Sequence, residues 1–189
     1  MVHSRAQATA LQAELDNHFP ERFTVALAMR YGNPAIRNVL EEFRQQHCRH
    51  LLVLPMFPQY SATTTASIFD EVTRVLQTWR MLPELRMPMH YHDKASYIEA
   101  LALTVEDSWK KNGRGELLLM SFHGLPQRYL NAGDHFFCEC MKTARLLADR
   151  LGIEASAWQA VFQSRFGRYP WLQPYLDKTL EGLPGKGVK

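Results

Sequence analysis

Hydrophobic side chains along this chain recur with two different periods. Apolar residues spaced three and four positions apart predict amphipathic helices, whereas short unbroken apolar runs between polar residues predict buried strands. The helical spacing predicts helices over residues 4–17, 35–47, 64–78, 96–109 and 137–151, and a last one between Pro170 and Gly182. The strand pattern predicts strands over residues 23–29, 51–54, 85–91, 117–121 and 158–162.

The predicted helices and strands alternate along the chain. Such alternation favours an α/β fold, in which parallel strands are joined by right-handed helical crossovers. Pro88 lies inside one predicted strand and lacks a backbone donor, so that strand is expected at the edge of its sheet. The glycine-containing loop 112–115 is the best candidate boundary, which gives domains over residues 1–112 and 113–189.

The most informative stretch runs from residue 115 to residue 126. Its core, residues 117–121, is apolar or small throughout and predicts a fully buried strand of a parallel sheet. His123 follows at the carboxyl end, where open α/β sheets bind ligands, and Gly124 permits a sharp turn of the backbone. His123 is therefore a candidate catalytic residue facing a cleft. The alternative is a structural histidine in the core, hydrogen-bonded to a backbone carbonyl.

Three predicted strand ends carry polar or aromatic side chains, namely residues 30–31, 57–65 and 121–126. Such ends share one edge of a parallel sheet, so they are expected to converge. In segment 57–65, four hydroxyl side chains stand beside two aromatic rings, although capping the next helix needs only one hydroxyl. This rim suits a flat, mostly apolar ligand with polar edges. The alternative is a simple strand–helix connection with a hydroxyl cap.

The segment after the last predicted strand adds further candidates. Gln163 and Ser164 end that strand and are expected at the same edge as the other polar strand ends. Trp171 follows Pro170 and either staples the start of the final helix or roofs the cleft. Asp134 is more simply explained as the N-cap of the next helix than as a catalytic acid.

Two short motifs contain potential metal ligands. Cys138-Glu-Cys140 offers two thiolates, half of a four-ligand zinc or iron–sulfur site, but free thiols at a helix start are the simpler interpretation. His90-Tyr-His92 places two imidazoles on one side of a strand end, which is able to bind a metal. A plain surface loop is the simpler interpretation of that second motif.

Composition limits the function further. The chain has 189 residues, 46% of them hydrophobic, and its net charge of +3 is too small and too dispersed to indicate nucleic-acid binding. No apolar run approaches the roughly 20 residues that span a bilayer, and the N-terminus lacks the apolar core of a secretion signal. Three cysteines, an odd number, argue against a secreted disulfide framework and favour the cytoplasm.

The segments around two of the predicted strand ends resemble the ferrochelatases, the terminal enzymes of haem synthesis. Ser121-Phe-His-Gly-Leu-Pro-Gln-Arg-Tyr129, with Gly133-Asp134 after it, looks like the signature of this family. Phe57-Pro-Gln-Tyr-Ser61, followed by its threonine run, is similar to the family's Tyr-Pro-Gln-Tyr-Ser loop. The two motifs together point to the family more specifically than either does alone.

Two further motifs extend the resemblance over nearly the whole chain. Phe162-Gln-Ser164 with Pro170-Trp-Leu172 resembles the loop of the family's second domain. Met29-Arg-Tyr31 with Pro34 matches a third strand end. The four motifs occur in the family's order, and together they resemble bacterial ferrochelatases closely.

The resemblance implies a chelatase-like, Rossmann-like α/β fold with two similar domains and a porphyrin cleft between them. It implies insertion of Fe²⁺ into protoporphyrin IX with release of two protons. The matching histidine, His123, is implied as the catalytic residue, either as ligand of the metal or as acceptor of a pyrrole proton. The neutral form of an imidazole suits both roles, because one ring nitrogen has a free lone pair. The resemblance also implies substrate binding by Arg30, Tyr31, Tyr60, Ser61, Thr63, Gln163, Ser164 and Trp171.

The sequence also departs from the family pattern. By comparison with the family, we expect the glutamate and histidine partners across its cleft to lie beyond Lys189, and the family's N-terminal strand to be missing. Both domains are therefore expected to be incomplete. Phe57 stands where many members have tyrosine, which removes a hydroxyl near the implied metal path. Ala62 stands where animal members have a cluster cysteine, so a [2Fe–2S] cluster is not expected, nor any cofactor beyond the Fe²⁺ substrate.

Three hypotheses for function remain open. The first is an iron-inserting ferrochelatase, and the second is a catalytically incomplete fragment of one that binds porphyrin or metal. The third is a regulatory metal or redox site on Cys138, Cys140, His90 and His92. The expected partners are protoporphyrin IX and Fe²⁺, without nucleic acid. A lipid-soluble porphyrin makes peripheral membrane contact reasonable, although no basic amphipathic helix argues for it.

Overall fold

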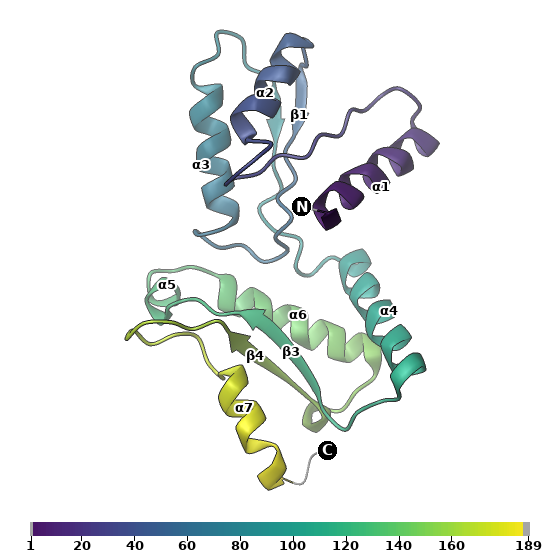
Figure 1. Ribbon diagram of the computed structural model, residues 1–189, viewed down its shortest axis with the longest axis vertical. Coiled ribbons are helices and arrows are strands. Elements are labelled where there is room, and N and C mark those ends of the chain that lie inside the picture. The colour runs from purple at the N-terminus through teal and green to yellow at the C-terminus, as the bar shows by residue number, and fades with distance from the viewer. Residues whose placement is uncertain (1, 187–189) are drawn as a thin grey trace. The chain divides into compact units, whose positions relative to one another are not determined.

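The computed structural model describes residues 2–186. The chain divides into two compact units (Figure 1): unit 1 comprises Met1–Leu54 with Ala66–Met87, and unit 2 comprises Pro55–Thr65 with Pro88–Lys189. Each unit contains a two-stranded parallel sheet with helices, which confirms the α/β class and the parallel pairing. The predicted boundary at residues 112–115 lies inside unit 2. The two domains predicted from the sequence therefore differ from the two compact units and stay a prediction.

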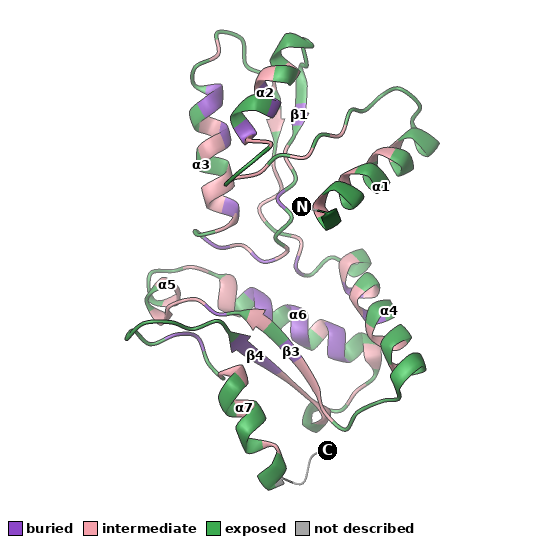
Figure 2. Cartoon of the chain, in the orientation of Figure 1, coloured by how far each residue is buried: buried purple, intermediate pink, exposed green. Residues whose placement is uncertain are grey.

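The elements of unit 1 are α1 (Val2–His18), α2 (Ile36–Gln45), β1 (His50–Leu52), α3 (Thr65–Leu76) and β2 (Glu84–Arg86). The two strands pair in parallel with Leu51 opposite Leu85. Apolar residues at helical spacing on α2 and α3 pack with Leu51 into one core: Ile36, Leu40, Val72, Val75 and Leu76. The periodicity that predicted both helices thus marks the faces that bury apolar area. None of the described residues of α1 is buried (Figure 2).

Residues 23–29 do not form the strand that their apolar pattern predicts. The side chain of Gln12 accepts a hydrogen bond from Val25 N–H at 2.6 Å and donates one to Phe23 C=O at 3.0 Å. These two backbone groups are bonded to a side chain, whereas in a strand they would be bonded to the backbone of a neighbouring strand. A strand needs a ladder with a neighbour. Within residues 2–186 this segment has only an isolated bridge, between Met29 and Ala35.

The elements of unit 2 are α4 (Ala95–Asn112), β3 (Leu118–His123), α5 (Gln127–Asn131), α6 (Phe136–Leu151), η1 (Ala155–Ala157), β4 (Trp158–Gln163), α7 (Leu176–Gly182) and η2 (Pro184–Lys186). Strands β3 and β4 pair in parallel from Leu118 opposite Trp158 to His123 opposite Gln163. Helix α6 lies in the crossover between them. Its apolar residues pack with both strands into one core: Met120, Ala144, Leu147, Ala148 and Ala160.

Strand β3 is less buried than its apolar sequence predicts. A strand reads as fully buried when both faces of its sheet are covered. In β3 only Met120 is buried, Ser121 and His123 are exposed, and the other three residues are half-buried. The prediction of a strand here is confirmed, whereas the prediction of complete burial is wrong.

Four further details differ from the sequence predictions. The strands belong to two separate sheets, so the expected single edge shared by all strand ends is wrong for the described residues. Strand β2 ends at Arg86, two residues before Pro88. Helix α5 is a short element that the pattern missed. The final helix α7 begins at Leu176, because Pro170 and Pro174 lie in an irregular segment that precedes it.

Within residues 2–186, no helix is long and apolar enough to cross a membrane.

Candidate functional site

The carboxyl ends of β3 and β4 bring two of the predicted site residues together. His123 and Gln163 are directly opposite each other in the parallel ladder. Both residues are exposed. The interpretation of His123 as a buried structural histidine is therefore wrong, and its imidazole is open to a ligand. Neighbouring strand ends position the two side chains because the ladder fixes the spacing of their backbones.

Gly124 holds the turn that follows His123 close to β4. Its N–H donates a hydrogen bond to Gln163 C=O at 2.7 Å. A Cβ atom at this position would lie 2.8 Å from the same oxygen and 3.4 Å from the Trp171 ring. Real Cβ atoms do not approach a backbone oxygen so closely, so only glycine fits here without a shift of the strand. The sequence indicated a glycine turn, and the structure shows that close backbone approach is its reason.

The buried ring of Trp171 packs beside the turn at Gly124. Its ring is buried, and Nε1–H donates to Phe166 C=O at 2.9 Å. Backbone contacts of its segment with the segment after β3, including Leu172 N–H to Leu125 C=O at 2.9 Å, hold it in place. Helix α7 starts later, so the interpretation of Trp171 as a staple for that helix is wrong. Its contact with substrate stays a prediction.

The loop between Gln163 and Trp171 borders an open hollow of about 570 Å³. Ser164 begins it in a left-handed conformation, with φ of 69°, which non-glycine residues adopt rarely and mostly at special sites. Aromatic and arginine side chains dominate the lining: Arg165, Phe166, Arg168, Tyr169, Trp171 and Tyr175. The Arg165 guanidinium lies 4.2 Å from the centre of the Tyr175 ring. Arg165 also pairs with Asp177 at 2.6 Å, so a negatively charged aromatic ligand in this hollow would share or replace that carboxylate.

The hydroxyl-rich loop is held by a carboxylate from the start of α6. Ser61 is fully buried and donates to Asp134 Oδ2 at 3.0 Å, and Ala62 N–H donates to the same oxygen at 2.8 Å. The other oxygen of Asp134 accepts Phe136 N–H at 2.9 Å. Asp134 therefore fastens the loop and accepts an N–H at the start of α6, but the N-cap residue of α6 is His135, so the interpretation of Asp134 as the N-cap is wrong. Ser61 positions the loop, and its predicted contact with substrate stays a prediction.

Thr63 and Tyr60 flank this anchor. Thr63 is exposed, its N–H donates to Ser61 Oγ at 3.1 Å, and its hydroxyl lies 2.9 Å from the same atom. Tyr60 is half-buried, and its N–H donates to Glu139 Oε2 at 2.7 Å. Both side chains belong to a loop whose backbone is fixed to α6, which is the arrangement that a binding loop needs.

Two positioning residues in this region were not among the predicted site residues, although Gln59 lies within the Phe57–Ser61 motif. Gln59 is buried and donates to Thr143 Oγ1 at 3.0 Å, and Thr143 in turn donates to His92 C=O at 2.9 Å. The partners are 84 and 51 residues apart in the chain. A spacing rule for helices or strands cannot find such pairs, because it compares only residues within a few turns.

Arg30 and Tyr31 belong to unit 1. Arg30 Nε donates to the C=O and the hydroxyl of Ser67 at 2.9 and 3.0 Å, so its guanidinium is held at the first turns of α3. Glu71 lies 3.9 Å from the same guanidinium. Tyr31 is 74% exposed and therefore available for contacts. The predicted roles of both residues in substrate binding stay predictions.

The comparisons with known proteins agree on one family. A model of the ferrochelatase family matches residues 1–189, the whole chain. This chain belongs to the ferrochelatase family. It is 54% identical over 186 residues to the ferrochelatase of Nitrosococcus oceani, and 51% identical over 189 residues to that of Marinobacter nauticus. These matches cover 98% and 100% of the chain but only 50% and 51% of the relatives, so the chain spans about half their length.

The fold of this chain also resembles a solved structure. A structure of SirB from Bacillus subtilis with Fe³⁺ matches with a TM-score of 0.66 and covers 94% of this chain and 64% of its own. At 15% identity, the match supports the fold alone. The α/β arrangement of small parallel sheets flanked by helices is therefore shared with that structure.

Among the described residues, the three cysteines do not combine into a metal site. Cys48 and Cys138 are exposed, whereas Cys140 is buried. No cysteine belongs to a group of three or more potential metal ligands within residues 2–186. Burial raises the pKa of the Cys140 thiol, and the thiol form is a poor metal ligand. The joint site of both thiols with His90 and His92, proposed from the sequence, is not formed.

Thiol labelling tests this difference between the cysteines. A maleimide at mildly alkaline pH is expected to modify Cys48 and Cys138 of the native protein quickly and Cys140 only after unfolding. The reason is that the thiolate is the reactive form, and burial disfavours it at Cys140. Peptide mass spectrometry with and without denaturant measures the labelling. Equal rates for Cys138 and Cys140 in the native protein would contradict the burial of Cys140.

Proposed function

We propose that this chain is part of an enzyme that inserts Fe²⁺ into protoporphyrin IX, with His123 at the reacting centre. Membership of the ferrochelatase family supports the reaction. The observation that carries the role of His123 is its exposure at the end of β3, beside Gln163. A rigid ladder and the close approach of Gly124 to β4 hold the residue at the edge of the sheet.

Insertion of a metal ion into a porphyrin needs a group that accepts a proton or binds the ion, and a nitrogen lone pair can do either. Insertion of Fe²⁺ replaces two pyrrole N–H protons, which leave as the metal–nitrogen bonds form. A neutral imidazole can accept one of these protons or ligate the incoming ion before transfer. Gln163 can donate or accept hydrogen bonds but cannot take up a proton near pH 7. His123 is therefore the basic group of this pair.

The loops around these strand ends suit a porphyrin. The hollow lined by residues 165–171 and Tyr175 presents aromatic faces with arginines beside them. A porphyrin is a flat aromatic ring whose carboxylate side chains can pair with guanidinium groups. We propose that Gln163, Ser164 and Trp171 bind substrate on this side. Tyr60 and Thr63 bind from the loop that Asp134 and Glu139 fasten, where the buried Ser61 holds the loop in place. Substrate binding by Arg30 and Tyr31 is a separate proposal that rests on the family resemblance.

A second candidate is that this chain alone binds porphyrin without inserting the metal. Two protons must leave the porphyrin, and one imidazole accepts one of them. This candidate is motivated by coverage, because the chain spans about half the length of the relatives that it matches. Neither candidate requires a cofactor beyond the Fe²⁺ substrate, and neither involves a [2Fe–2S] cluster.

Porphyrin titration followed by addition of iron separates the two candidates. Protoporphyrin IX is added to the protein while its Soret band is followed, and Fe²⁺ is then added without oxygen. Saturable binding followed by the absorption spectrum of haem, faster than without protein, supports the enzyme. Saturable binding without haem formation supports the second candidate. Failure to bind porphyrin at all would contradict both.

A further inference from the structure

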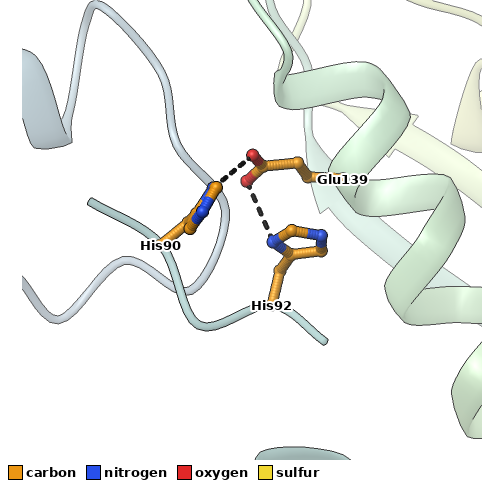
Figure 3. Close-up of side chains that lie close together, drawn as sticks. All are labelled: His90, His92 and Glu139. Atoms are coloured by element: carbon orange, nitrogen blue, oxygen red, sulfur yellow. Dashed lines mark hydrogen bonds and ion pairs between the residues drawn. The ribbon is translucent and has the colours of Figure 1, made fainter. Parts of the chain in front are cut away.

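Two histidines and a glutamate from distant parts of unit 2 meet at one point (Figure 3). His90 and His92 lie on the segment before α4, and Glu139 lies on the first turn of α6. His90 Nδ1 is 2.7 Å from Glu139 Oε1, and His92 Nδ1 is 3.2 Å from Glu139 Oε2. One potential ligand atom from each residue lies within 4.8 Å of the others. The sequence motif His90-Tyr-His92 thus has a third partner, far along the chain, that no pattern indicated.

One nitrogen in this group is buried without a hydrogen bond. His92 is 6% exposed, and its Nδ1 has no partner in hydrogen-bond geometry, although Glu139 Oε2 is nearby. That oxygen already accepts Tyr60 N–H at 2.7 Å. A buried ring nitrogen left without a partner is costly, so its position beside a carboxylate needs an explanation. A cation between the two groups satisfies both the nitrogen and the carboxylate.

We propose that His90, His92 and Glu139 form a binding site for one divalent transition-metal ion of the Zn²⁺ or Fe²⁺ type. Two imidazole nitrogens with one carboxylate oxygen are the ligand set these ions favour, whereas Mg²⁺ and Ca²⁺ favour oxygen ligands. Ligand atoms about 2.1 Å from one ion in tetrahedral geometry lie roughly 3.4 Å apart. The distances from Glu139 to His90 Nδ1, 2.7 Å, and to His92 Nδ1, 3.2 Å, are shorter than this spacing. Small outward rotations of the three side chains would make room for the ion.

The surrounding hydrogen bonds hold these ligands in place. Tyr60 N–H fixes the carboxylate of Glu139, and the Thr143 hydroxyl fixes the backbone at His92 C=O. Metal ligands in proteins are oriented by such neighbours. The bound ion would join α6, the segment of His90 and the loop of Tyr60 into one rigid support.

This site is separate from the reacting centre proposed above. His123 is not among the three ligands. The ion at the new site stays with the protein and stiffens the loop that carries Tyr60, whereas the ion at His123 is the substrate. The site stands on the geometry of its three residues and does not depend on the proposed reaction.

Metal titration of the chain and four variants tests this site. Tag-free protein is stripped with a chelator and titrated with Zn²⁺ by calorimetry, with Mg²⁺ as the comparison, and with Co²⁺ by visible absorption. The variants are His90→Ala, Glu139→Gln, His50→Ala and His123→Ala. His50 is the matched control, because its Nδ1 lies 3.1 Å from the Glu84 carboxylate without a third ligand among the described residues.

Both test variants are expected to fold, which circular dichroism checks. His90 is largely exposed, so its replacement leaves no cavity in the core. The Glu139→Gln change replaces the carboxylate by an amide of nearly the same shape, and the amide oxygen can still accept Tyr60 N–H.

The expected result is one Zn²⁺ bound per chain at this site. His90→Ala and Glu139→Gln should each weaken binding by at least tenfold, since residues that merely orient ligands are worth about 10–100-fold. His50→Ala and His123→Ala should retain the ion, Mg²⁺ should not compete, and Zn²⁺ should slow hydrogen exchange at the Tyr60 amide. Equal Zn²⁺ affinity in the wild type, His90→Ala and Glu139→Gln would overturn the proposal. So would loss of this ion in His123→Ala or His50→Ala.

Discussion

Replacement of His123 by alanine in a ferrochelatase that contains this chain is expected to slow iron insertion by about 10²–10⁴-fold, the usual contribution of a positioned acid–base group. His123 is exposed at the end of β3, and its neighbour in the ladder is Gln163, which cannot take up a proton. Alanine removes the imidazole but keeps the backbone of the strand. Porphyrin affinity should stay within the same order of magnitude, because the rings and guanidinium groups of the hollow are unchanged.

Initial rates of haem formation and a Soret titration measure the two effects separately. His135→Ala is the control, because His135 is an exposed histidine at the start of α6 whose side chain makes no capping hydrogen bond. The control should retain its turnover. Turnover of His123→Ala equal to that of His135→Ala would remove His123 from the reacting centre. A loss of porphyrin binding as large as the loss of rate would assign it to binding instead.

Replacement of Phe162 by alanine is expected to lower the free energy of unfolding of unit 2 by about 3–5 kcal/mol, the range found for large aromatic residues in protein cores. Phe162 is 1% exposed, the most deeply buried large side chain in its cluster with Cys140 and Leu172. Its ring stacks on Phe137 at 5.6 Å and packs against Phe122 at 6.1 Å. Alanine leaves a cavity between β4 and α6 that these rigid neighbours cannot fill.

Urea unfolding followed by circular dichroism measures this loss. Phe166→Ala is the matched control, because Phe166 is 76% exposed and the carbonyl that accepts Trp171 Nε1–H is kept in the variant. Its loss should be below about 1 kcal/mol, as is usual for a surface position. Phe162 precedes Gln163 in the ladder, so its replacement should also reduce the rigidity of the His123 site. Similar unfolding midpoints for both variants would contradict the core position of Phe162.

The helices were predicted well because their signal is local. Ile36, Val39 and Leu40 recur at helical spacing, and all three are buried on α2. The same rule found α6, where Ala144, Leu147 and Ala148 face the sheet. The backbone hydrogen bonds of a helix form within the same segment of chain, so the spacing of its apolar residues is enough to predict it.

Strands were predicted less well because they depend on partners. Residues 23–29 have the apolar pattern of a strand, yet Gln12 takes the backbone hydrogen bonds of Val25 and Phe23. The apolar run over residues 117–121 predicted a fully buried strand, but within β3 only Met120 is buried. Both errors have one cause: a strand gains its hydrogen bonds and its burial from other segments, which its own residues do not specify.

The candidate site around His123 was predicted in part. The motif around His123 indicated a strand, a glycine turn and an exposed imidazole, and the structure shows all three. That Gly124 is required by the backbone oxygen of Gln163, far along the chain, follows only from the parallel pairing of β3 with β4. The burial of Ser61 against Asp134 likewise appears only in three dimensions, because 73 residues separate them.

The sequence by itself determined the longer helices, the position of β3 and the motifs that assign the chain to the ferrochelatase family, because each rests on residues near one another in the chain. The tertiary structure alone decided which polar groups meet. Glu139 lies within a cysteine motif of the sequence, but its carboxylate contacts His90, His92 and the Tyr60 backbone. Such contacts form when helices and loops pack, since packing joins residues that no local period relates.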